Sequence, residues 1–183
     1  MTKVLIPLAE GCEELEAVTL IDLLRRAGIT VVTASLTDQH QLTASRGVGL
    51  VADATLDDVI INDFDMLVLP GGQPGTDNLN ADPRIHAIAK RLYLAGKPIA
   101  AICAAPLVFV SSGLLKGKKV ACYPGSLTAE KQFDIDICDD AIVVDNNIFT
   151  SRGPGTAMDF ALTLIEHLAN KQTRDEVEAG LVR

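Results

Sequence analysis

Cys103 is the residue whose surroundings most clearly favour chemistry. The apolar run Pro98–Ile102 has the pattern of a buried strand and leads straight into Cys103, and a helix-like segment, Leu107–Leu115, follows after a few small residues. A thiol in the turn between a strand and a helix faces free backbone N–H groups and the positive end of the helix dipole, which favour an anion. The pattern predicts a nucleophile elbow with a positive φ and a lowered thiol pKa at Cys103. The alternative is a buried, inert cysteine.

Two further groups could serve such a thiol. Acidic residues gather where a first helix is expected to begin, at Glu10, Glu13, Glu14 and Glu16. The helix dipole alone accounts for most of them, and the apolar neighbours do not show which acid points inward. The pair Gly71-Gly72 could offer backbone N–H groups to a developing oxyanion, or could simply form a turn.

The elements that must position these groups alternate along the chain. Apolar and β-branched runs predict strands at 4–8, 30–35, 65–69, 98–102, 119–123, 141–145 and 148–151, the last two joined by a hairpin turn at Asn146-Asn147. Periodicity and capping signals predict helices at 13–27, 82–95, 107–115, 126–133, 155–170 and 173–181. The segment 42–52 is either a hairpin or an extended excursion. The alternation predicts an α/β fold: a mostly parallel sheet with helices on both faces.

Ligands of such sheets bind at the carboxyl ends of the strands. Three features fall at those ends: the acid-rich loop after the first strand, Gly71-Gly72 and Cys103. Their convergence favours the reactive cysteine over the inert one.

Length, net charge and cysteine spacing limit the kinds of protein that this sequence can encode. With 183 residues, 48% of them hydrophobic, the chain is expected to form one domain, residues 1–183. The net charge is −8 and the short basic cluster Lys116–Lys119 is expected to be a solvated turn, so we predict no specific nucleic-acid binding. The four cysteines form no Cys-x-x-Cys and the three histidines are not spaced with them as ligands, so we expect no metal and no cofactor.

The start of the chain and its longest uncharged run indicate where in the cell the protein is expected. Met1-Thr2-Lys3 leads directly into a strand, so we expect no signal peptide and place the reduced thiols in the cytoplasm. Pro98–Leu115 carries no charge, but Pro106 and the break at Ser111-Ser112-Gly113 favour strand, turn and helix over a membrane span.

Four ordered motifs carry a resemblance to a known family. They are Gly11-Cys12-Glu13-Glu14-Leu15-Glu16, Leu69-Pro70-Gly71-Gly72, Ala100-Ala101-Ile102-Cys103-Ala104-Ala105-Pro106 and Thr150-Ser151-Arg152-Gly153-Pro154-Gly155-Thr156, with Arg25-Arg26-Ala27-Gly28-Ile29 and Ser45-Arg46 in support. The sequence resembles the DJ-1/ThiJ/PfpI superfamily, and most closely its DJ-1 (deglycase) branch in a bacterial-type form.

The resemblance implies a fold and roles for individual residues. The fold would be a flavodoxin-like three-layer sandwich that forms a homodimer. Cys103 would be the nucleophile and oxidation-sensing thiol, and Glu16, rather than Glu13 or Glu14, would contact its sulfur. Gly72 and Ala104 would supply backbone donors. The rest of the pocket would be formed by Gly71, Arg46, Tyr123, Arg152 and Pro154, the last two near the dimer interface.

Two positions depart from patterns within the superfamily. Tyr123-Pro124 stands where the animal DJ-1 pattern has a histidine before the proline, so a third catalytic member is missing. Ala104 stands where the protease branch has a histidine, which argues against a cysteine protease. No downstream histidine could be assigned to a glutaminase.

The expected function is therefore cysteine-dependent detoxification of reactive carbonyls. The substrates would be small aldehydes such as methylglyoxal and glyoxal, or glycated adducts, handled by glyoxalase III-type hydration or protein deglycase activity linked to oxidative stress. The alternative is a non-enzymatic redox sensor or chaperone that is oxidised at Cys103. Whether Cys12 or Cys122 couples to Cys103 as a resolving thiol is left open.

Overall fold

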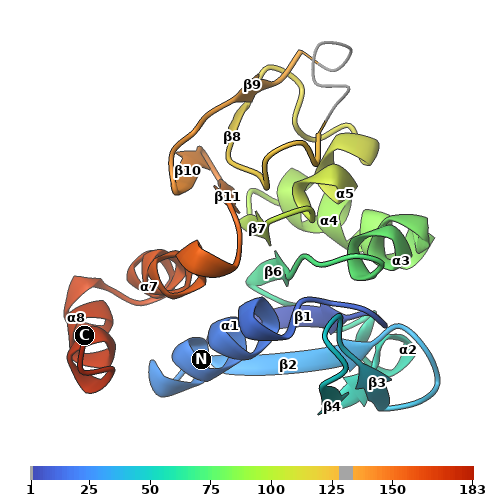
Figure 1. Cartoon of the computed structure of the whole chain (residues 1–183), viewed down its shortest axis with the longest axis horizontal. Helices are drawn as coiled ribbons and strands as arrows, with labels where there is room; N and C mark the ends of the chain where they lie inside the picture. The colour runs from blue at the N-terminus through green and yellow to red at the C-terminus, as the bar shows by residue number, and fades with distance from the viewer. Residues whose placement is uncertain (1, 128–133) are drawn as a thin grey trace.

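The central layer is a seven-stranded sheet with the strand order β10-β11-β7-β6-β1-β2-β5. The computed structural model describes residues 2–127 and 134–183 (Figure 1). The strands, in chain order, are β1 Lys3–Leu8, β2 Thr30–Ser35, β5 Ala54–Thr55, β6 Met66–Leu69, β7 Ile99–Ile102, β10 Ile142–Asp145 and β11 Ile148–Ser151. All neighbours pair in parallel except β10, which returns antiparallel to β11. The mostly parallel sheet and the hairpin at Asn146-Asn147 are thus confirmed.

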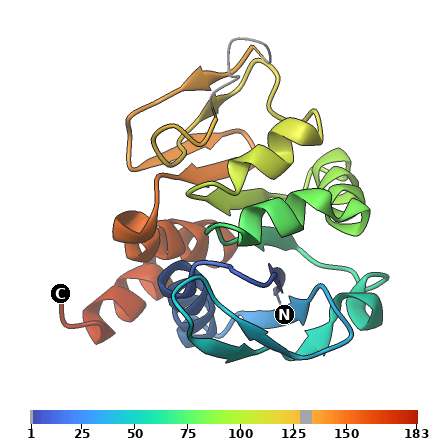
Figure 2. The same ribbon diagram turned by 45° about the vertical axis from the view of Figure 1, so that its right-hand side comes forward.

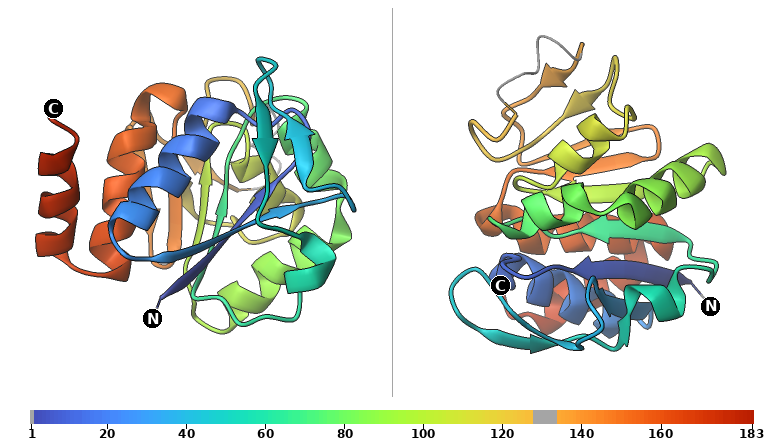
Figure 3. Two further views of the ribbon diagram at one scale, coloured as in Figure 1. Left: turned by 90° about the horizontal axis from the view of Figure 1, so that it is seen from below. Right: turned by 90° about the vertical axis from the view of Figure 1, so that its right-hand side faces the viewer.

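Helices cover both faces of this sheet. On one side lie α1 (Glu14–Arg26), α7 (Ala157–Leu168) and α8 (Lys171–Gly180); on the other lie α2 (Leu56–Val59), α3 (Gly75–Ala81), α4 (Pro83–Leu94) and α5 (Pro106–Ser111) (Figure 3). The central strand β1 shows why its sequence is continuously apolar. Val4 and Ile6 belong to the buried cluster under α1 and α7, and Leu5 belongs to the cluster under α4 and α5. The predicted three-layer α/β sandwich is confirmed.

Smaller elements lie outside the central sheet. The segment 42–52 is a hairpin, β3 (Gln41–Thr43) with β4 (Gly49–Val51), and it passes beside the start of α1 (Figure 2). β8 (Lys119–Val120) pairs with β9 (Asp136–Ile137) in a separate two-stranded sheet. The strand predicted over 119–123 is therefore shorter than expected, because the chain turns away at Ala121 to approach Cys103.

The helices differ from the prediction in several places. The helix predicted over 107–115 ends earlier, at Ser111, and the chain turns at Gly113, whose φ is 73°. The helix predicted over 155–170 divides into a 3-10 turn, η1 (Pro154–Thr156), and α7. α2 and α3 were not predicted, since both are short and lack an amphipathic repeat. Most of the helix predicted over 126–133 falls outside the described residues.

The long uncharged run of the sequence divides as expected into β7, a turn and α5. Within residues 2–127 and 134–183, no helix is both long and apolar enough to cross a membrane.

Candidate active site

Cys103 occupies the tight turn between β7 and α5. Its φ is 65°, which confirms the predicted elbow geometry. The backbone around it is fixed on two sides: the Cys103 N–H donates to the Ser151 carbonyl at 2.9 Å, and the Cys103 carbonyl accepts from the Tyr123 N–H at 2.8 Å. The side chain is 8% exposed, so its sulfur lies at the base of a recess and not on an open surface.

The turn after β6 comes so close to the thiol that only glycine fits. A Cβ added at Gly71 would lie 2.6 Å from the Cys103 Cβ and 2.9 Å from Glu16 Oε2. A Cβ at Gly72, whose φ is 90°, would lie 2.4 Å from the Glu13 nitrogen. The N–H groups of Gly72 and Ala104 both hydrogen bond toward the Cys103 sulfur and act to lower its pKa. The two backbone donors expected from the sequence therefore meet at one atom.

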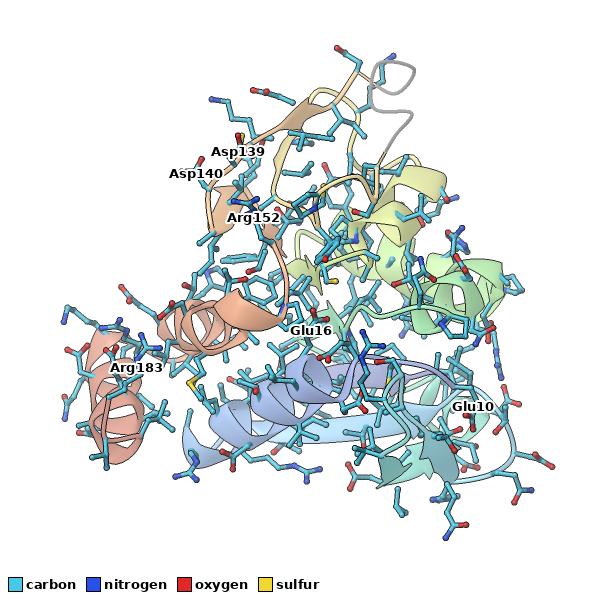
Figure 4. The ribbon with its side chains drawn as sticks, viewed as in Figure 1. Glu10, Glu16, Asp139, Asp140, Arg152 and Arg183 are labelled. Atoms are coloured by element: carbon cyan, nitrogen blue, oxygen red, sulfur yellow. The ribbon has the colours of Figure 1, made fainter. Side chains whose placement is uncertain are left out.

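Glu16 is the acid that α1 directs inward. Its side chain is fully buried, and Figure 4 shows it extending from α1 toward the middle of the molecule. Oε2 accepts a hydrogen bond from the Gly71 N–H at 2.8 Å. Oε1 is buried and meets no N–H or O–H donor among the described residues, whereas the Cys103 thiol lies within hydrogen-bonding reach of the carboxyl group. Glu16 thus has one oxygen fixed and one available for a proton.

The other acids of the first turn have structural partners. Glu13 caps α1 by accepting from the Glu16 N–H at 2.8 Å. Glu14 accepts from the Ser45 hydroxyl at 2.9 Å and from the Arg46 N–H at 2.8 Å, which holds the hairpin loop against the helix. Glu10 accepts from the Thr43 N–H at 3.0 Å.

Burial disfavours a charge on either member of the Cys103–Glu16 pair. It raises the pKa of Glu16 to about 7, against the opposing effect of the Gly71 N–H. Burial, followed by the nearby Glu16 carboxylate, raises the pKa of Cys103 to about 12 despite the N–H groups of Gly72 and Ala104. The lowered thiol pKa predicted from the sequence is therefore wrong: the helix-end donors are present, but desolvation and a like charge outweigh them.

The two pKa values belong to the pair more than to either residue. The first proton leaves near pH 7, and the second is retained because two adjacent anions in a buried site repel each other. Near neutral pH the pair is therefore about half ionised, and between the two pKa values it carries one negative charge and one exchangeable proton shared by oxygen and sulfur. This is a general base in contact with a nucleophile, tuned to physiological pH.

The sulfur opens into a hollow of about 440 Å³, here called the reaction hollow. It is lined by Glu13, Ser45, Arg46, Gly72, Gln73, Cys103, Ala104, Tyr123, Pro124, Gly125, Ser126 and Pro154. Of the residues predicted for the pocket, Arg46, Tyr123 and Pro154 lie on its wall, and Gly71 lies behind the thiol. Arg152 lines an adjoining hollow instead.

A sequence model described as the DJ-1/PfpI family matches residues 2–167. This chain belongs to the DJ-1/PfpI family. Protein DJ-1 homolog B of Arabidopsis thaliana is 42% identical over 171 residues, which are 93% of this chain and 39% of the relative. The chain spans less than half of the length of the two Arabidopsis thaliana DJ-1 homologues that it matches.

Two further relatives bear on the site. The protein named glutathione-independent glyoxalase DJR-1.2, from Caenorhabditis elegans, is 33% identical and aligns with 90% of this chain and 87% of its own length. The structure of oxidized Toxoplasma gondii DJ-1 superposes with a TM-score of 0.93 at 39% identity, over 100% of this chain and 98% of that one.

Several wall residues of this DJ-1/PfpI member escaped sequence reasoning. Glu13 was treated only as a helix-end acid, although it both caps α1 and borders the reaction hollow. Gln73 follows directly after Gly72, and that adjacency was the available signal. Ser126 was placed in a predicted helix. The family resemblance placed Tyr123 in the pocket, but no local pattern indicates that Pro124, Gly125 and Ser126 line it as well.

The other cysteines are also located. Cys12 is buried in the cluster under α1 together with Cys103, and burial raises the pKa of Cys12 to about 12. Cys122 belongs to the cluster on the opposite face of the sheet. Neither residue lines the reaction hollow. Among the described residues, no three His, Cys, Asp or Glu side chains gather as a metal site.

Proposed function

We propose that this protein converts small reactive α-oxo aldehydes, such as methylglyoxal and glyoxal, or their early adducts, into 2-hydroxy acids. The observation that carries the proposal is a single constellation. A buried carboxyl group with one available oxygen and a pKa of about 7 lies against a thiol at the base of a hollow, and two backbone N–H groups face the same sulfur.

The first step follows from the protonation of the pair. Ionised Glu16 accepts the thiol proton while the Cys103 sulfur attacks the aldehyde carbon, so no free thiolate has to accumulate. A C–S bond forms, and the aldehyde oxygen becomes the hydroxyl of a hemithioacetal by taking up that proton. The N–H groups of Gly72 and Ala104 support the negative charge that develops next to the sulfur.

The second step is an internal rearrangement. Glu16 removes the proton from the former aldehyde carbon and returns it to the neighbouring carbon, through an enediol, while the hydroxyl proton of the hemithioacetal moves to the ketone oxygen. The former aldehyde carbon becomes a thioester and the ketone becomes a secondary alcohol, so one carbon is oxidised as the other is reduced. Water then cleaves the C–S bond, releases lactate from methylglyoxal and restores the thiol. Water is the only co-reactant that the overall conversion of methylglyoxal to lactate requires.

The comparisons support this reaction class without assigning it. One relative carries the name glutathione-independent glyoxalase, which describes that relative. We extend the activity to this chain because its own residues meet the requirements of the chemistry. Deglycase activity on adducts would begin with a displacement instead: the Cys103 sulfur forms a bond to the adduct carbon, the bond from that carbon to the carrier breaks, and the thiol proton passes through Glu16 to the carrier.

The test is lactate formation from methylglyoxal by the purified protein. We expect turnover by the wild type and its loss in Cys103→Ser. Cys138→Ser is the matched control, since Cys138 does not line the reaction hollow and should retain full turnover. Equal turnover by wild type and Cys103→Ser would refute the mechanism.

A second function, redox sensing with a chaperone role, is favoured by a specific observation. No histidine lines the reaction hollow among the described residues, so Glu16 is its proton-exchanging group near neutral pH. Protonated Glu16 and the two backbone donors would also stabilise a sulfinate at Cys103. Sulfinate formation by mass spectrometry at low peroxide, with no lactate formation, would favour the sensor over the enzyme.

We further propose a homodimer in the reducing cytoplasm, with α1 and the neighbourhood of Arg152 to Pro154 at the interface. Exposed apolar side chains support this arrangement: Leu15 and Val18 on α1, and Val48 and Val51 on the neighbouring hairpin. Sedimentation at micromolar concentration should give a dimer, and a monomer alone would contradict the proposal.

A further inference from the structure

A second hollow adjoins the first and is called the outer hollow. Its volume is about 380 Å³, and it shares Tyr123, Pro124 and Pro154 with the reaction hollow. Its remaining wall residues are Asp139, Ala141, Arg152, Gly153, Gly155 and Thr156. Methylglyoxal is far smaller than either space. A substrate that reacts at Cys103 therefore has room for a longer part beyond Tyr123.

Arg152 and Asp139 bring opposite charges to the outer hollow without neutralising each other. Arg152 Nη1 donates to the backbone carbonyl of Asp139 at 3.1 Å, and the Arg152 N–H donates to the Ala141 carbonyl at 3.1 Å. These two bonds hold the residue in place. Within the described part of the chain, neither the Arg152 guanidinium nor the Asp139 carboxylate belongs to an ion pair.

The charged residues of the outer hollow indicate which ligand groups it can bind. Asp139 and Arg152 are labelled beside each other in Figure 4, in keeping with the bond from Arg152 Nη1 to the Asp139 carbonyl. Neither charged side chain of the outer hollow is paired with an opposite charge in the described residues, so each can take up a ligand group of opposite charge. A guanidinium can bind a carboxylate through two parallel hydrogen bonds, and an aspartate can accept from an ammonium group. A ligand that carries both an ammonium and a carboxylate can therefore pair with both residues at once.

We propose that the outer hollow binds the zwitterionic amino-acid end of a small thiol that carries the aldehyde as a hemithioacetal. This inference rests on the proposed function and names its substrate class. Arg152 would bind the carboxylate and Asp139 the ammonium, while the hemithioacetal carbon reaches Cys103. Both are specificity-determining residues, outside the reacting atoms.

The step on such a substrate is balanced. The bond between the hemithioacetal carbon and the carrier sulfur breaks, and a bond from the same carbon to the Cys103 sulfur forms. The Cys103 proton passes through Glu16 to the departing sulfur, so the carrier leaves as a neutral thiol. No oxidant or reductant takes part.

The test uses four matched thiols as methylglyoxal hemithioacetals. γ-Glutamyl-cysteamine carries both charges, glutaryl-cysteamine lacks the ammonium, 4-aminobutyryl-cysteamine lacks the carboxylate, and butyryl-cysteamine lacks both. We expect kcat/KM to be highest for the first and to fall about 1.4- to fivefold for each missing charge, the range for exposed ion pairs.

Variants assign each preference to a residue. Arg152→Gln should abolish the preference for the carboxylate and keep that for the ammonium, and Asp139→Asn should do the reverse. Asp140→Asn, a change next to the hollow, should leave the ratios as in the wild type. Because Arg152 lies near the proposed dimer interface, the variants are compared at equal oligomeric state.

Two results would overturn the inference: equal kcat/KM for all four adducts, or a loss in Arg152→Gln that is the same for every adduct. Turnover of free methylglyoxal is measured in parallel. If it persists while the ratios are flat, the outer hollow is not a subsite but the proposed function stands. If wild-type turnover is absent altogether, the proposed function itself fails.

Discussion

The reaction hollow and the outer hollow share the side chain of Tyr123 but are built differently. The reaction hollow is formed at the ends of β1, β6 and β7, where the backbone of Gly71 and Gly72 packs so closely that an added Cβ would lie within 3 Å of neighbouring atoms. The outer hollow is formed by turns, and its charged residues are partly or largely exposed. Groups that must exchange a proton with each other are held by the sheet, whereas groups that would only attract a ligand are held by loops.

The largest effect expected from breaking this arrangement is that of Glu16→Gln. The amide keeps a hydrogen-bonding group in place but cannot accept the thiol proton. We expect methylglyoxal turnover to fall by about a hundredfold or more, the usual range for loss of a general base. Glu14→Gln, on the same helix turn but bonded to Ser45 and Arg46, should cost far less. Equal turnover by Glu16→Gln and wild type would remove Glu16 from the mechanism.

Gly71→Ala compares the two hollows directly. The new Cβ would collide with the Cys103 Cβ and Glu16 Oε2, so we expect destabilisation of about 1–3 kcal/mol and a large loss of turnover. Gly155→Ala, in the outer hollow, meets no atom within 4 Å and should leave both quantities nearly unchanged. Denaturant unfolding and lactate formation measure the two effects. Similar costs at both positions would show that the reaction hollow is not tightly packed.

The pH dependence of turnover follows from the pKa of Glu16. Because the base must be ionised, kcat/KM should rise about tenfold per pH unit below its pKa and level off above about 7. In Glu16→Gln this inflection should disappear. An inflection near the ordinary glutamate value would show that burial does not shift the group.

The same shift predicts how stability depends on pH. Glu16 binds its proton more tightly in the folded state, with a pKa of about 7 against a model-compound value of 4.5. The free energy of unfolding should therefore fall as pH rises between these values, by about 3 kcal/mol from this group. Glu16→Gln should be more stable than wild type at about pH 8 and should lose that advantage below pH 4.5. A difference between the two proteins that does not vary with pH would contradict this.

The smallest effect is expected at Tyr123, on the boundary of the two hollows. Its side chain is half exposed, and a neutral hydrogen bond from its hydroxyl contributes only about 0.5–1.5 kcal/mol. Tyr123→Phe should therefore reduce turnover by about tenfold at most. Abolished activity would make Tyr123 a catalytic residue, and increased activity in Tyr123→His would show that the missing imidazole limits the rate.

Sequence reasoning succeeded where a residue's role is set by local pattern. The apolar runs predicted the sheet, and the strand–Cys103–helix order predicted the positive φ. The choice of Glu16 over Glu13 and Glu14 came from the family resemblance, because the periodicity of α1 did not decide it. The structure now gives the reason: Glu16 alone of the three is fully buried.

Sequence reasoning failed where long-range packing decides. The direction in which the Cys103 pKa shifts depends on the burial of its sulfur and on the carboxyl group of Glu16, 87 positions earlier in the chain. The elbow motif shows neither of these effects. The short helix α3 lacks a periodic pattern. The return of Tyr123 to the carbonyl of Cys103 is likewise a tertiary contact without a local signal.

The first turn of α1 ties two separate loops to one another, the loop at Gly71 and the hairpin loop at Arg46. Glu13 receives the Glu16 N–H and donates its own to the Gly71 carbonyl, Glu14 holds Arg46, and Glu16 holds the Gly71 N–H. Fraying of this single turn would release both loops together. The amide protons of Gly71, Arg46 and Glu16 should therefore exchange with deuterium at a common opening free energy, even though up to 55 positions separate them in the chain.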